Sequence, residues 1–206
     1  MATVPRIEPV ELEGAHVRLE PLGPHHLPGL VHAGRDPRIW RWMPLDGSTP
    51  EGMAVIVEGA LAAQAAGNEL PFVTVERATG RVVGSTRYLA LAPAHLRLEI
   101  GWTWIDPEFQ RSAVNSEAKL LGMSHAFDRL GMRRVEFKTD ALNEQSRTAI
   151  LGIGAHFEGI FRKHMVMPGG RARDSAYYSV IDTEWHDVRA HLQARLARHS
   201  SKEGSQ

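Results

Sequence analysis

The segment from Gln110 to Ser116 has the features of an anion-binding loop. It follows a strand that ends at Ile105 and leads into a helix that is expected to begin at Ser116. The first backbone N–H groups of a helix lack intrahelical acceptors, and the helix dipole adds partial positive charge there. Such a helix start binds phosphate or diphosphate, and Arg111 adds a cation beside it. The alternative is an ordinary helix start with Ser116 as its N-cap.

Two carboxylates near this loop are candidates for proton transfer. Glu99 lies on the strand at 97–105, where side chains alternate between two faces. The apolar face of this strand is expected to carry Leu98, Ile100, Trp102 and Trp104. Glu99 therefore lies on the opposite face, as a base, as a solvated strand charge, or as an ion-pair partner of Arg97 or Arg87. Asp140 follows the strand at 135–139, as a second base candidate or as a turn residue.

Composition limits the classes of protein. The chain has 206 residues, 43% of them hydrophobic, and no cysteine, which excludes disulfides and thiolate chemistry. Lys plus Arg and Asp plus Glu both number 24, so the basic excess of a nucleic-acid binder is missing. No segment resembles a membrane span or a signal peptide, which fits a cytoplasmic protein. Eleven histidines occur without a His-Glu-x-x-His motif, so no metal is expected.

The elements that position these residues read as one domain at 13–198, with tails at 1–12 and 199–206, the last expected to be disordered. Strands are expected at 17–22, 71–76, 81–90, 97–105, 135–139, 157–166 and 176–181. Helices are expected at 25–33, 49–67, 116–130, 143–151 and 185–198. Ser48 and Glu51 have capping-box spacing for the second helix. The order of these elements indicates a mixed α/β or α+β domain.

The motifs between Gln110 and Gly159 resemble those of the GNAT superfamily of N-acetyltransferases. The family has a Gln/Arg-x-x-Gly-x-Gly/Ala loop, and this chain has Gln110-Arg111-Ser112-Ala113-Val114-Asn115 in that place. Ala113 replaces a glycine, so its φ is expected to be negative. The stretches 137–146 and 154–159 resemble the RimJ/RimL-like branch, the ribosomal-protein N-terminal acetyltransferases. The resemblance covers about 12–185 and implies a mixed, mostly antiparallel central sheet flanked by helices.

The resemblance also implies an activity and its residues. It implies that acetyl passes from acetyl-CoA (coenzyme A) directly to a primary amine, without a metal. Glu99 becomes the leading base, with Asp140 second. Ser146 is a hydrogen-bond donor to the leaving thiolate or a polar residue of the first helical turn. Tyr177 and Tyr178 are distant alternatives as the acid, or ordinary strand aromatics. The implied cofactor contacts are the backbone of Trp104 and Ile105, the loop residues Gln110, Arg111, Ser112, Ala113, Val114, Asn115 and Ser116, and Asn143, which is also expected to cap its helix.

The acceptor side is less determined by the sequence. The acceptor is a small-molecule amine or a protein N-terminus, and a lysine-type amine needs a base more because it is mostly protonated at neutral pH. Trp40 and Trp42 lie in a segment that forms an acceptor-pocket wall in the family, or they anchor the core. Neither nucleic acid nor membrane is expected as a partner, and a homodimer is allowed. Alternatives are a non-catalytic acetyl-CoA sensor and a nucleic-acid binder that uses the arginines of the last helix.

Overall fold

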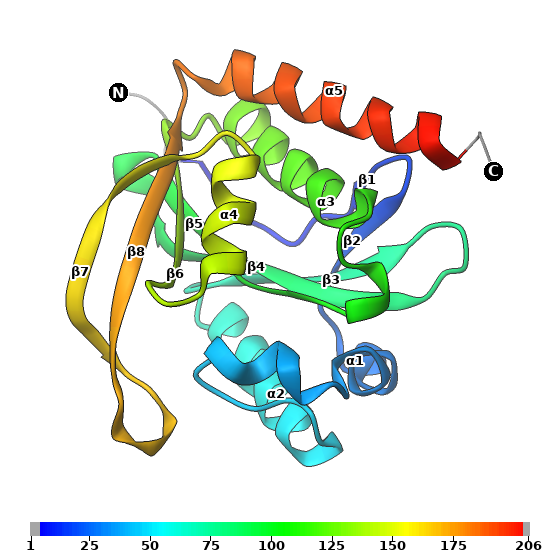
Figure 1. The fold of residues 1–206 in the computed structure, drawn as a ribbon, viewed down its shortest axis with the longest axis vertical. Helices are drawn as coiled ribbons and strands as arrows, with labels where there is room; N and C mark the ends of the chain where they lie inside the picture. Colours follow the sequence, from blue (N-terminus) through cyan, green and yellow to red (C-terminus); the bar gives the residue numbers. More distant parts are fainter. Residues whose placement is uncertain (1–4, 204–206) are drawn as a thin grey trace.

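The computed structural model describes residues 5–203 and shows an eight-stranded sheet with helices on both faces (Figure 1). The order of strands is β1-β2-β3-β4-β5-β6-β8-β7. The strands are β1 (Leu12–Glu13), β2 (Val17–Pro21), β3 (Leu70–Glu76), β4 (Val82–Ala92), β5 (Arg97–Ile105), β6 (Arg134–Asp140), β7 (His156–Val166) and β8 (Ala172–Ile181). Within the described residues β5 and β6 are parallel neighbours, and the other adjacent pairs are antiparallel. The predicted mixed, mostly antiparallel sheet is confirmed.

Five α-helices cover this sheet. They are α1 (Leu27–Gly34), α2 (Pro50–Ala65), α3 (Ala113–Ser124), α4 (Glu144–Gly152) and α5 (Trp185–Glu203). Figure 1 shows α1 and α2 on one face of the sheet, and α3, α4 and α5 on the other. A π-helical turn, His125–Arg129, continues α3. No helix among residues 5–203 is long and apolar enough to cross a membrane.

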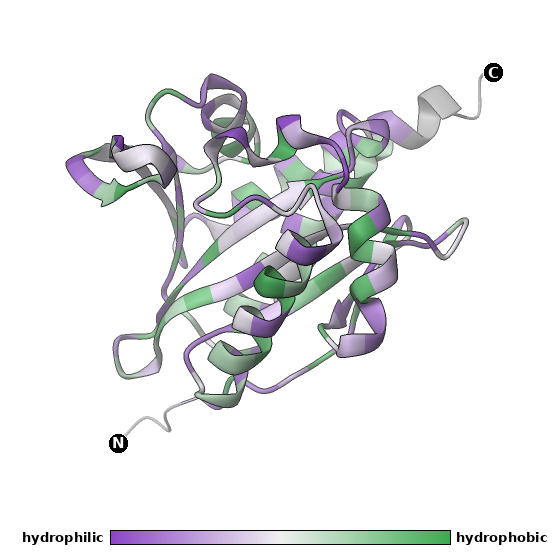
Figure 2. Ribbon diagram, turned by 90° about the horizontal axis from the view of Figure 1, so that it is seen from below, coloured by the Kyte–Doolittle hydropathy of each residue, from purple (hydrophilic) through white to green (hydrophobic). Residues whose placement is uncertain are grey.

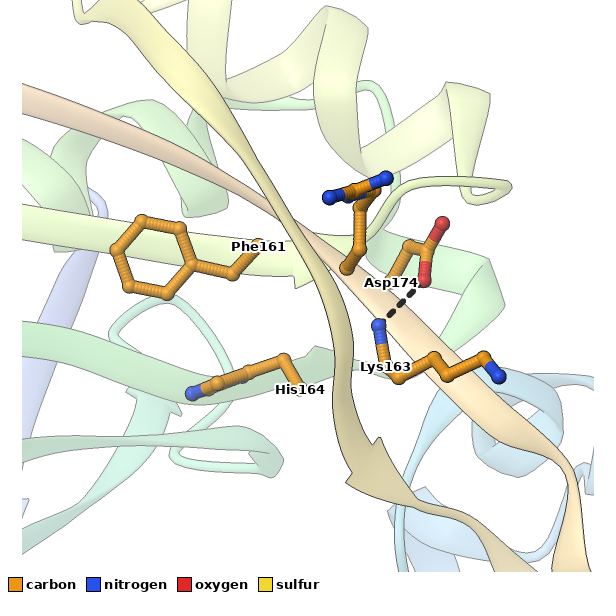
Figure 3. A pocket seen from close by; sticks show the side chains of 5 residues that line it. Phe161, Lys163, His164 and Asp174 are labelled. Carbon is orange, nitrogen blue, oxygen red and sulfur yellow. Dashed lines mark hydrogen bonds between the residues drawn. The ribbon is translucent and has the colours of Figure 1, made fainter.

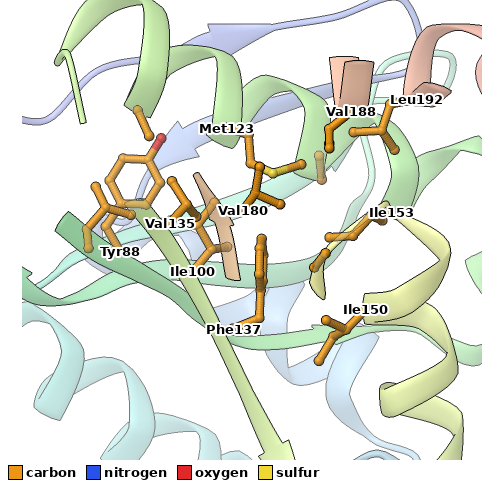
Figure 4. Close-up of a cluster of buried hydrophobic side chains, with 14 of the residues drawn as sticks. Tyr88, Ile100, Met123, Val135, Phe137, Ile150, Ile153, Val180, Val188 and Leu192 are labelled. Atoms are coloured by element: carbon orange, nitrogen blue, oxygen red, sulfur yellow. The ribbon is translucent and has the colours of Figure 1, made fainter. Parts of the chain in front are cut away.

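The larger hydrophobic core lies between the sheet and the helices α3, α4 and α5. Figure 4 shows this cluster, in which Met123 of α3 and Leu192 of α5 face Val135 and Phe137 of β6. All four side chains are at most 1% exposed. Burial on this scale stabilises the fold by roughly 1.5–3 kcal/mol per large apolar side chain. Helix α3, which carries the candidate cofactor loop, is therefore held firmly against β6.

The second core lies on the opposite face, under α1 and α2. Leu30 of α1 and Met53 of α2 pack there with Trp40 and Val73. Seen from this side, green and purple residues alternate along the helices that cross the strands, as expected for helices with one buried face (Figure 2). Helices α1 and α2 thus cover the part of this face that carries Val73, Val75 and Trp104, whereas β7 is exposed along most of its length.

Strands β5 and β6 are paired over only part of their length. Their parallel register pairs Arg97 with Arg134 and ends with Glu99 opposite Glu136. Strand β5 continues to Ile105 along β4, whereas β6 continues along β8. The two strands therefore diverge after Glu99, and we call this opening the β5–β6 fork.

A bulge in β5 changes the predicted faces of this strand. Trp102 has a φ of 49°, in the left-handed region, and the register with β4 shifts nearby. Leu98 and Ile100 point into the larger core, but Trp102 and Trp104 pack into the second core. The prediction that these four residues share one face is therefore wrong. The extra residue of a bulge reverses the alternation beyond it.

Two predicted helix starts also differ from the structure. Thr49, not Ser48, caps α2, because its hydroxyl accepts the N–H of Gly52 at 3.1 Å. Helix α3 begins at Ala113 with Ser112 as N-cap, so Ser116 lies inside the helix and is buried. The backbone N–H groups that lack intrahelical acceptors therefore lie in a first turn that begins at Ala113, three residues earlier than expected.

The ends of the chain are more ordered than the sequence suggested. Helix α5 extends to Glu203, so the expected disordered tail is helical over residues 199–203, and residues 204–206 lie outside the described residues. At the other end, Ile7 and Val10 pack against the larger core. Of the arginines proposed as a nucleic-acid surface, Arg189 pairs with Asp128 and Arg195 donates to the carbonyl oxygen of Gly152, whereas Arg198 is exposed.

Candidate active site

Glu99 stands at the base of the β5–β6 fork. Its side chain is 3% exposed, and its Oε2 lies 3.1 Å from the Nζ of Lys138 on β6. A side chain at Gly101 would collide with the carboxylate, because an added Cβ would lie 2.7 Å from Oε1 of Glu99. The glycine leaves room for the Glu99 side chain beside the fork.

The environment of Glu99 suits a proton acceptor. Burial raises the pKa of this carboxyl, and the ammonium of Lys138 opposes that rise. The expected structural partners have other contacts: Arg97 pairs with Glu136 at 3.4 Å, and Arg87 pairs with Glu69 at 2.9 Å. Glu99 is buried and its ion pair is with Lys138, so the alternatives of a solvated charge and of a pair with one of these arginines are both wrong.

The loop before α3 is shaped by its own hydrogen bonds. The Ser112 hydroxyl donates to the carbonyl oxygen of Phe109 at 2.6 Å and accepts the N–H of Val114 at 3.2 Å. Arg111 carries the left-handed backbone, with a φ of 62°, and its side chain is exposed. Ala113 is the first helical residue, and its φ is not positive, as expected. Asn115 also lies within the helix.

A hollow lies beside this helix start, and both a basic and an acidic side chain border it. It is lined by Ala15, His16, Glu76, Arg77, Ala78, Phe109, Ser112, Ala113 and Val114. The guanidinium of Arg77 and the amides at the start of α3 border it, which suits a phosphate group. Arg77 also pairs with Glu13 at 3.0 Å, so part of its charge is already balanced.

Gln110 joins the end of β5 to the start of α4. Its side-chain nitrogen donates to the carbonyl oxygen of Ile105 at 3.1 Å, and its side-chain oxygen accepts from Gln145 at 3.1 Å. Asn143 caps α4 by accepting the N–H of Ser146 at 3.1 Å. The structure thus shows the capping part of the prediction for Asn143. The half-buried hydroxyl of Ser146 lies in the first turn of this helix.

Trp104 and Ile105 form the last two residues of β5. They pair with Ser85 and Gly84 of β4, and the other edge of β5 faces the fork. Their side chains are buried in opposite cores, so only their backbone can meet a ligand.

Asp140 at the end of β6 is engaged in structural contacts. It is 1% exposed, forms an ion pair with Arg171, and accepts the N–H of Leu142 at 3.0 Å. These contacts match the turn role that the sequence offered as the alternative to a catalytic base.

A polar surface extends from Glu99 across β6, β8 and β7, on the face opposite the larger core. The Nζ of Lys138 lies 5.9 Å from the ring centre of Tyr177, and the Tyr177 hydroxyl lies 3.4 Å from Nε2 of His164. Figure 3 shows Phe161 and His164 pointing to the same side of β7, and the ring of Phe161 stacks on Tyr177 at 4.2 Å. Burial raises the pKa of Tyr177, and the charges of Glu99 and Glu136 add to that rise. Tyr177 thus lies nearer to Glu99 than the sequence indicated.

The two tryptophans before α2 have different places. Trp40 is 4% exposed, and its indole N–H donates to the carbonyl oxygen of Gly34 at 2.7 Å, so it anchors the second core. Trp42 is half-buried, and the guanidinium of Arg171 lies 5.7 Å from its ring centre. Trp42 therefore connects the segment before α2 to the β7–β8 turn, at the rim of the polar surface.

Lys119 is a buried cation that the sequence did not single out. It lies on α3, is 6% exposed, and donates from Nζ to Oγ1 of Thr103 at 2.6 Å. Tyr178, the other tyrosine considered, is fully buried and accepts from Nε of Arg147 at 3.0 Å. A lysine between polar helix residues looks like a surface residue, so no sequence signal separates Lys119 from an exposed one.

The adjacent histidines His25 and His26 lie close together. The rings of His25 and His26 are 3.9 Å apart, and with Glu20 they bring potential metal-ligand atoms within 4.8 Å of one another. However, Nε2 of His26 bonds to Glu20 at 3.0 Å, and its Nδ1 accepts the N–H of Gly23 at 3.0 Å. Both nitrogens of His26 are thus used in a local turn.

Comparison with known proteins agrees with this geometry. The family described as "Acetyltransferase (GNAT) domain" matches residues 16–156. The chain belongs to the GNAT acetyltransferase family, and the resemblance predicted from its motifs is confirmed.

Individual relatives extend the comparison. The chain is 33% identical over 105 residues to the uncharacterized N-acetyltransferase YoaA of Bacillus subtilis, covering 51% of this chain and 58% of that protein. It is also 30% identical over 106 residues to YdaF, a protein of the same organism that is provisionally named a ribosomal N-acetyltransferase. This match covers 52% of this chain and 57% of YdaF. The matched region thus spans slightly more than half of the length of each of these curated relatives. The crystal structure of a GCN5-related N-acetyltransferase from Brucella melitensis is 34% identical, with a TM-score of 0.88, covering 95% of this chain and 90% of that one.

Proposed function

We propose that the chain is an acetyl-CoA-dependent N-acetyltransferase that acts on a primary amine by direct attack. The observation that carries this proposal is the fork: β5 and β6 stop pairing at Glu99, and α3 begins just beyond the end of β5. An opening between two strands leaves backbone donors and acceptors of β5 available for an extended amide-containing chain. The pantetheine arm of coenzyme A is such a chain.

The residues at the two ends of this opening fit the two ends of the cofactor. The amides at the start of α3, with Arg111, are suited to its diphosphate. The backbone of Trp104 and Ile105 faces the arm and the thioester. When bound, acetyl-CoA supplies an activated acetyl group and a thiolate leaving group.

Glu99 is the base in this proposal. It takes a proton from the acceptor nitrogen, directly or through one water, as that nitrogen attacks the acetyl carbonyl. Burial raises the pKa of this carboxyl, which makes the carboxylate a stronger base, and the ammonium of Lys138 limits that rise. Asp140, held by Arg171, serves to fix the end of β6.

The acceptor enters over the polar surface on the Glu99 side of the sheet. Trp42 and Tyr177 provide aromatic surface at its borders, and Trp40 supports the wall from the core. The acceptor is a small-molecule amine or a protein N-terminus, the latter in keeping with the provisional name of YdaF.

Release of free thiol from acetyl-CoA, measured with a panel of amines and N-terminal peptides, tests the proposal. We expect turnover with at least one amine, and calorimetric binding of coenzyme A. Binding without turnover on any amine would instead support a non-catalytic acetyl-CoA sensor. Absence of binding would reject both.

The variant Glu99→Gln separates the base from the cofactor site. We expect turnover to fall by about 10²–10⁴-fold, the usual contribution of a general base, with unchanged affinity for coenzyme A. Glu144→Gln, at an exposed position on α4, is the matched control and should keep full turnover. Equal turnover of the Glu99 variant and the wild type across the pH range would remove Glu99 from the mechanism.

A further inference from the structure

Lys119 lies beneath the β5–β6 fork, on the side of α3. Its Nζ bonds to Thr103, a β5 residue beyond the last paired position, and lies 5.6 Å from the ring centre of Phe137 on β6. The amine is thus in contact with both strands that border the opening. In the proposed function, a molecule inserted into the fork would lie next to this amine.

The hydrogen bonds of Lys119 are incomplete for a buried cation. An ammonium has three donor hydrogens. Among the described residues Thr103 is the acceptor that the structure gives it, and no carboxylate lies within 4.0 Å of its nitrogen. Thr103 also bonds to Thr86 at 2.8 Å. A buried charge with one neutral partner is costly, and such a group gains most when a ligand supplies an acceptor.

The surroundings of Lys119 bring the pKa of its amine close to neutral pH. Burial lowers its pKa from 10.5 to about 7, and Glu99 on β5 is the charged group that opposes this shift. The other groups that contact it, Thr103 and Phe137, are uncharged. The amine therefore exchanges its proton near neutral pH.

We propose that Lys119 is a further residue of the transfer reaction, and that its amine bonds to the sulfur of coenzyme A and protonates the departing thiolate. This inference rests on the proposed function, because it places the sulfur in the fork. It assigns to Lys119 the part that the sequence offered to Ser146, whose hydroxyl is a weaker acid than an ammonium.

The proton balance is complete with the residues present. A bond forms between the acceptor nitrogen and the acetyl carbon, and the bond between that carbon and sulfur breaks. Glu99 receives one proton from the acceptor nitrogen, and Lys119 gives one to the sulfur. Exchange with solvent then returns Glu99 to its ionised form and Lys119 to its protonated form.

The test is the pKa of the thiol of bound coenzyme A, followed by the ultraviolet absorbance of the thiolate as pH is raised. The complex with desulfo-coenzyme A, which lacks the sulfur, provides the background. A nearby ammonium stabilises a thiolate, so in the wild type we expect a pKa about one unit or more below the usual value, which is that of free coenzyme A measured in the same way. A thiol pKa at or above the usual value in the wild type would by itself overturn the proposal.

Variants assign the effect to this residue. Lys119→Met retains a long unbranched side chain but lacks the amine, and we expect the thiol pKa to return to or above the usual value. Lys119→Gln is a second neutral variant, and Lys163→Met on β7, an exposed lysine, should leave the thiol pKa unchanged. An equally lowered pKa in the wild type and in a folded neutral variant would overturn the assignment.

Turnover tests the role of Lys119 independently of the thiol pKa. Lys119→Met should lower kcat by about 10²-fold, while KM for acetyl-CoA changes little. Failure of coenzyme A to bind the wild type would reject the proposed function itself. Binding with an unperturbed thiol would reject only the role of Lys119.

Discussion

The Nζ of Lys138 and the Oε2 of Glu99 lie 3.1 Å apart at the point where β5 and β6 diverge. This ion pair joins the two strands just where their backbone ladder stops. It also sets the proton affinity of the candidate base, because the cation opposes the effect of burial.

Removing this cation should move the pH dependence of turnover. Lys138 lowers the pKa of Glu99, so Lys138→Met raises that pKa further. Since the ionised carboxylate is the active form, activity should disappear at a higher pH on the acidic side, with a similar plateau. The pH profile of kcat/KM checks this expectation. Lys163→Met serves as the control, and a shift toward lower pH would contradict the assignment.

Arg111 combines a charge with an unfavourable backbone. Its φ of 62° costs a non-glycine residue about 1 kcal/mol, so Arg111→Gly should not lower the free energy of unfolding. Loss of the cation should weaken coenzyme A binding several-fold. Calorimetry with acetyl-pantetheine, which lacks the diphosphate, should show no difference between variant and wild type. Unchanged affinity for coenzyme A would remove Arg111 from the phosphate site.

Glu117 holds the segment before β2 against α3. Its carboxylate accepts the N–H groups of Ala15, His16 and Val17 at 2.9, 2.6 and 2.7 Å. A glutamine amide has one acceptor oxygen, so Glu117→Gln leaves at least one donor unpaired and should lower the free energy of unfolding by about 2 kcal/mol. Urea denaturation measures the loss. The exposed Glu144→Gln should stay close to the wild type, and equal stability of all three proteins would contradict the role of Glu117.

Lys119 should make stability depend on pH. Its pKa is about 7 in the folded protein against an ordinary value of 10.5, so between these values the unfolded chain binds more protons. Stability due to this group is therefore lost as pH falls toward 7, by up to about 1.4 kcal/mol per pH unit. Relative to the wild type, Lys119→Met should be most stable near pH 7 and lose that advantage as pH rises. A difference independent of pH, in denaturation at several pH values, would contradict the burial of a titrating amine.

The sequence was sufficient for the regular parts of this molecule. Alternation and helical periodicity located the five α-helices and the strands from β2 to β8, because most of them bury one continuous face, whereas the two-residue β1 was not predicted. The bulge at Trp102 could not be predicted, since a positive φ at a tryptophan depends on how β5 pairs with β4. The start of α3 was misplaced because Ser112 and Ser116 are both good N-caps, and the Phe109 carbonyl decides between them.

The candidate site was predicted to a similar degree. Glu99 was found because alternation in the first half of β5 is regular, and the loop was found from its place after a strand. The places of Lys119 and Tyr177 depend on contacts between elements distant in the sequence, which periodicity does not report.

The contact between Trp42 and Arg171 has an evolutionary consequence. These residues come from two separate stretches of chain, one before α2 and one in the β7–β8 turn, and neither stretch supplies Glu99 or the start of α3. In the proposed function, substitutions in both stretches would therefore remodel the acceptor entrance and leave Glu99 and the start of α3 unchanged. Descendants of this chain would then acquire new amines without rebuilding the proposed chemistry.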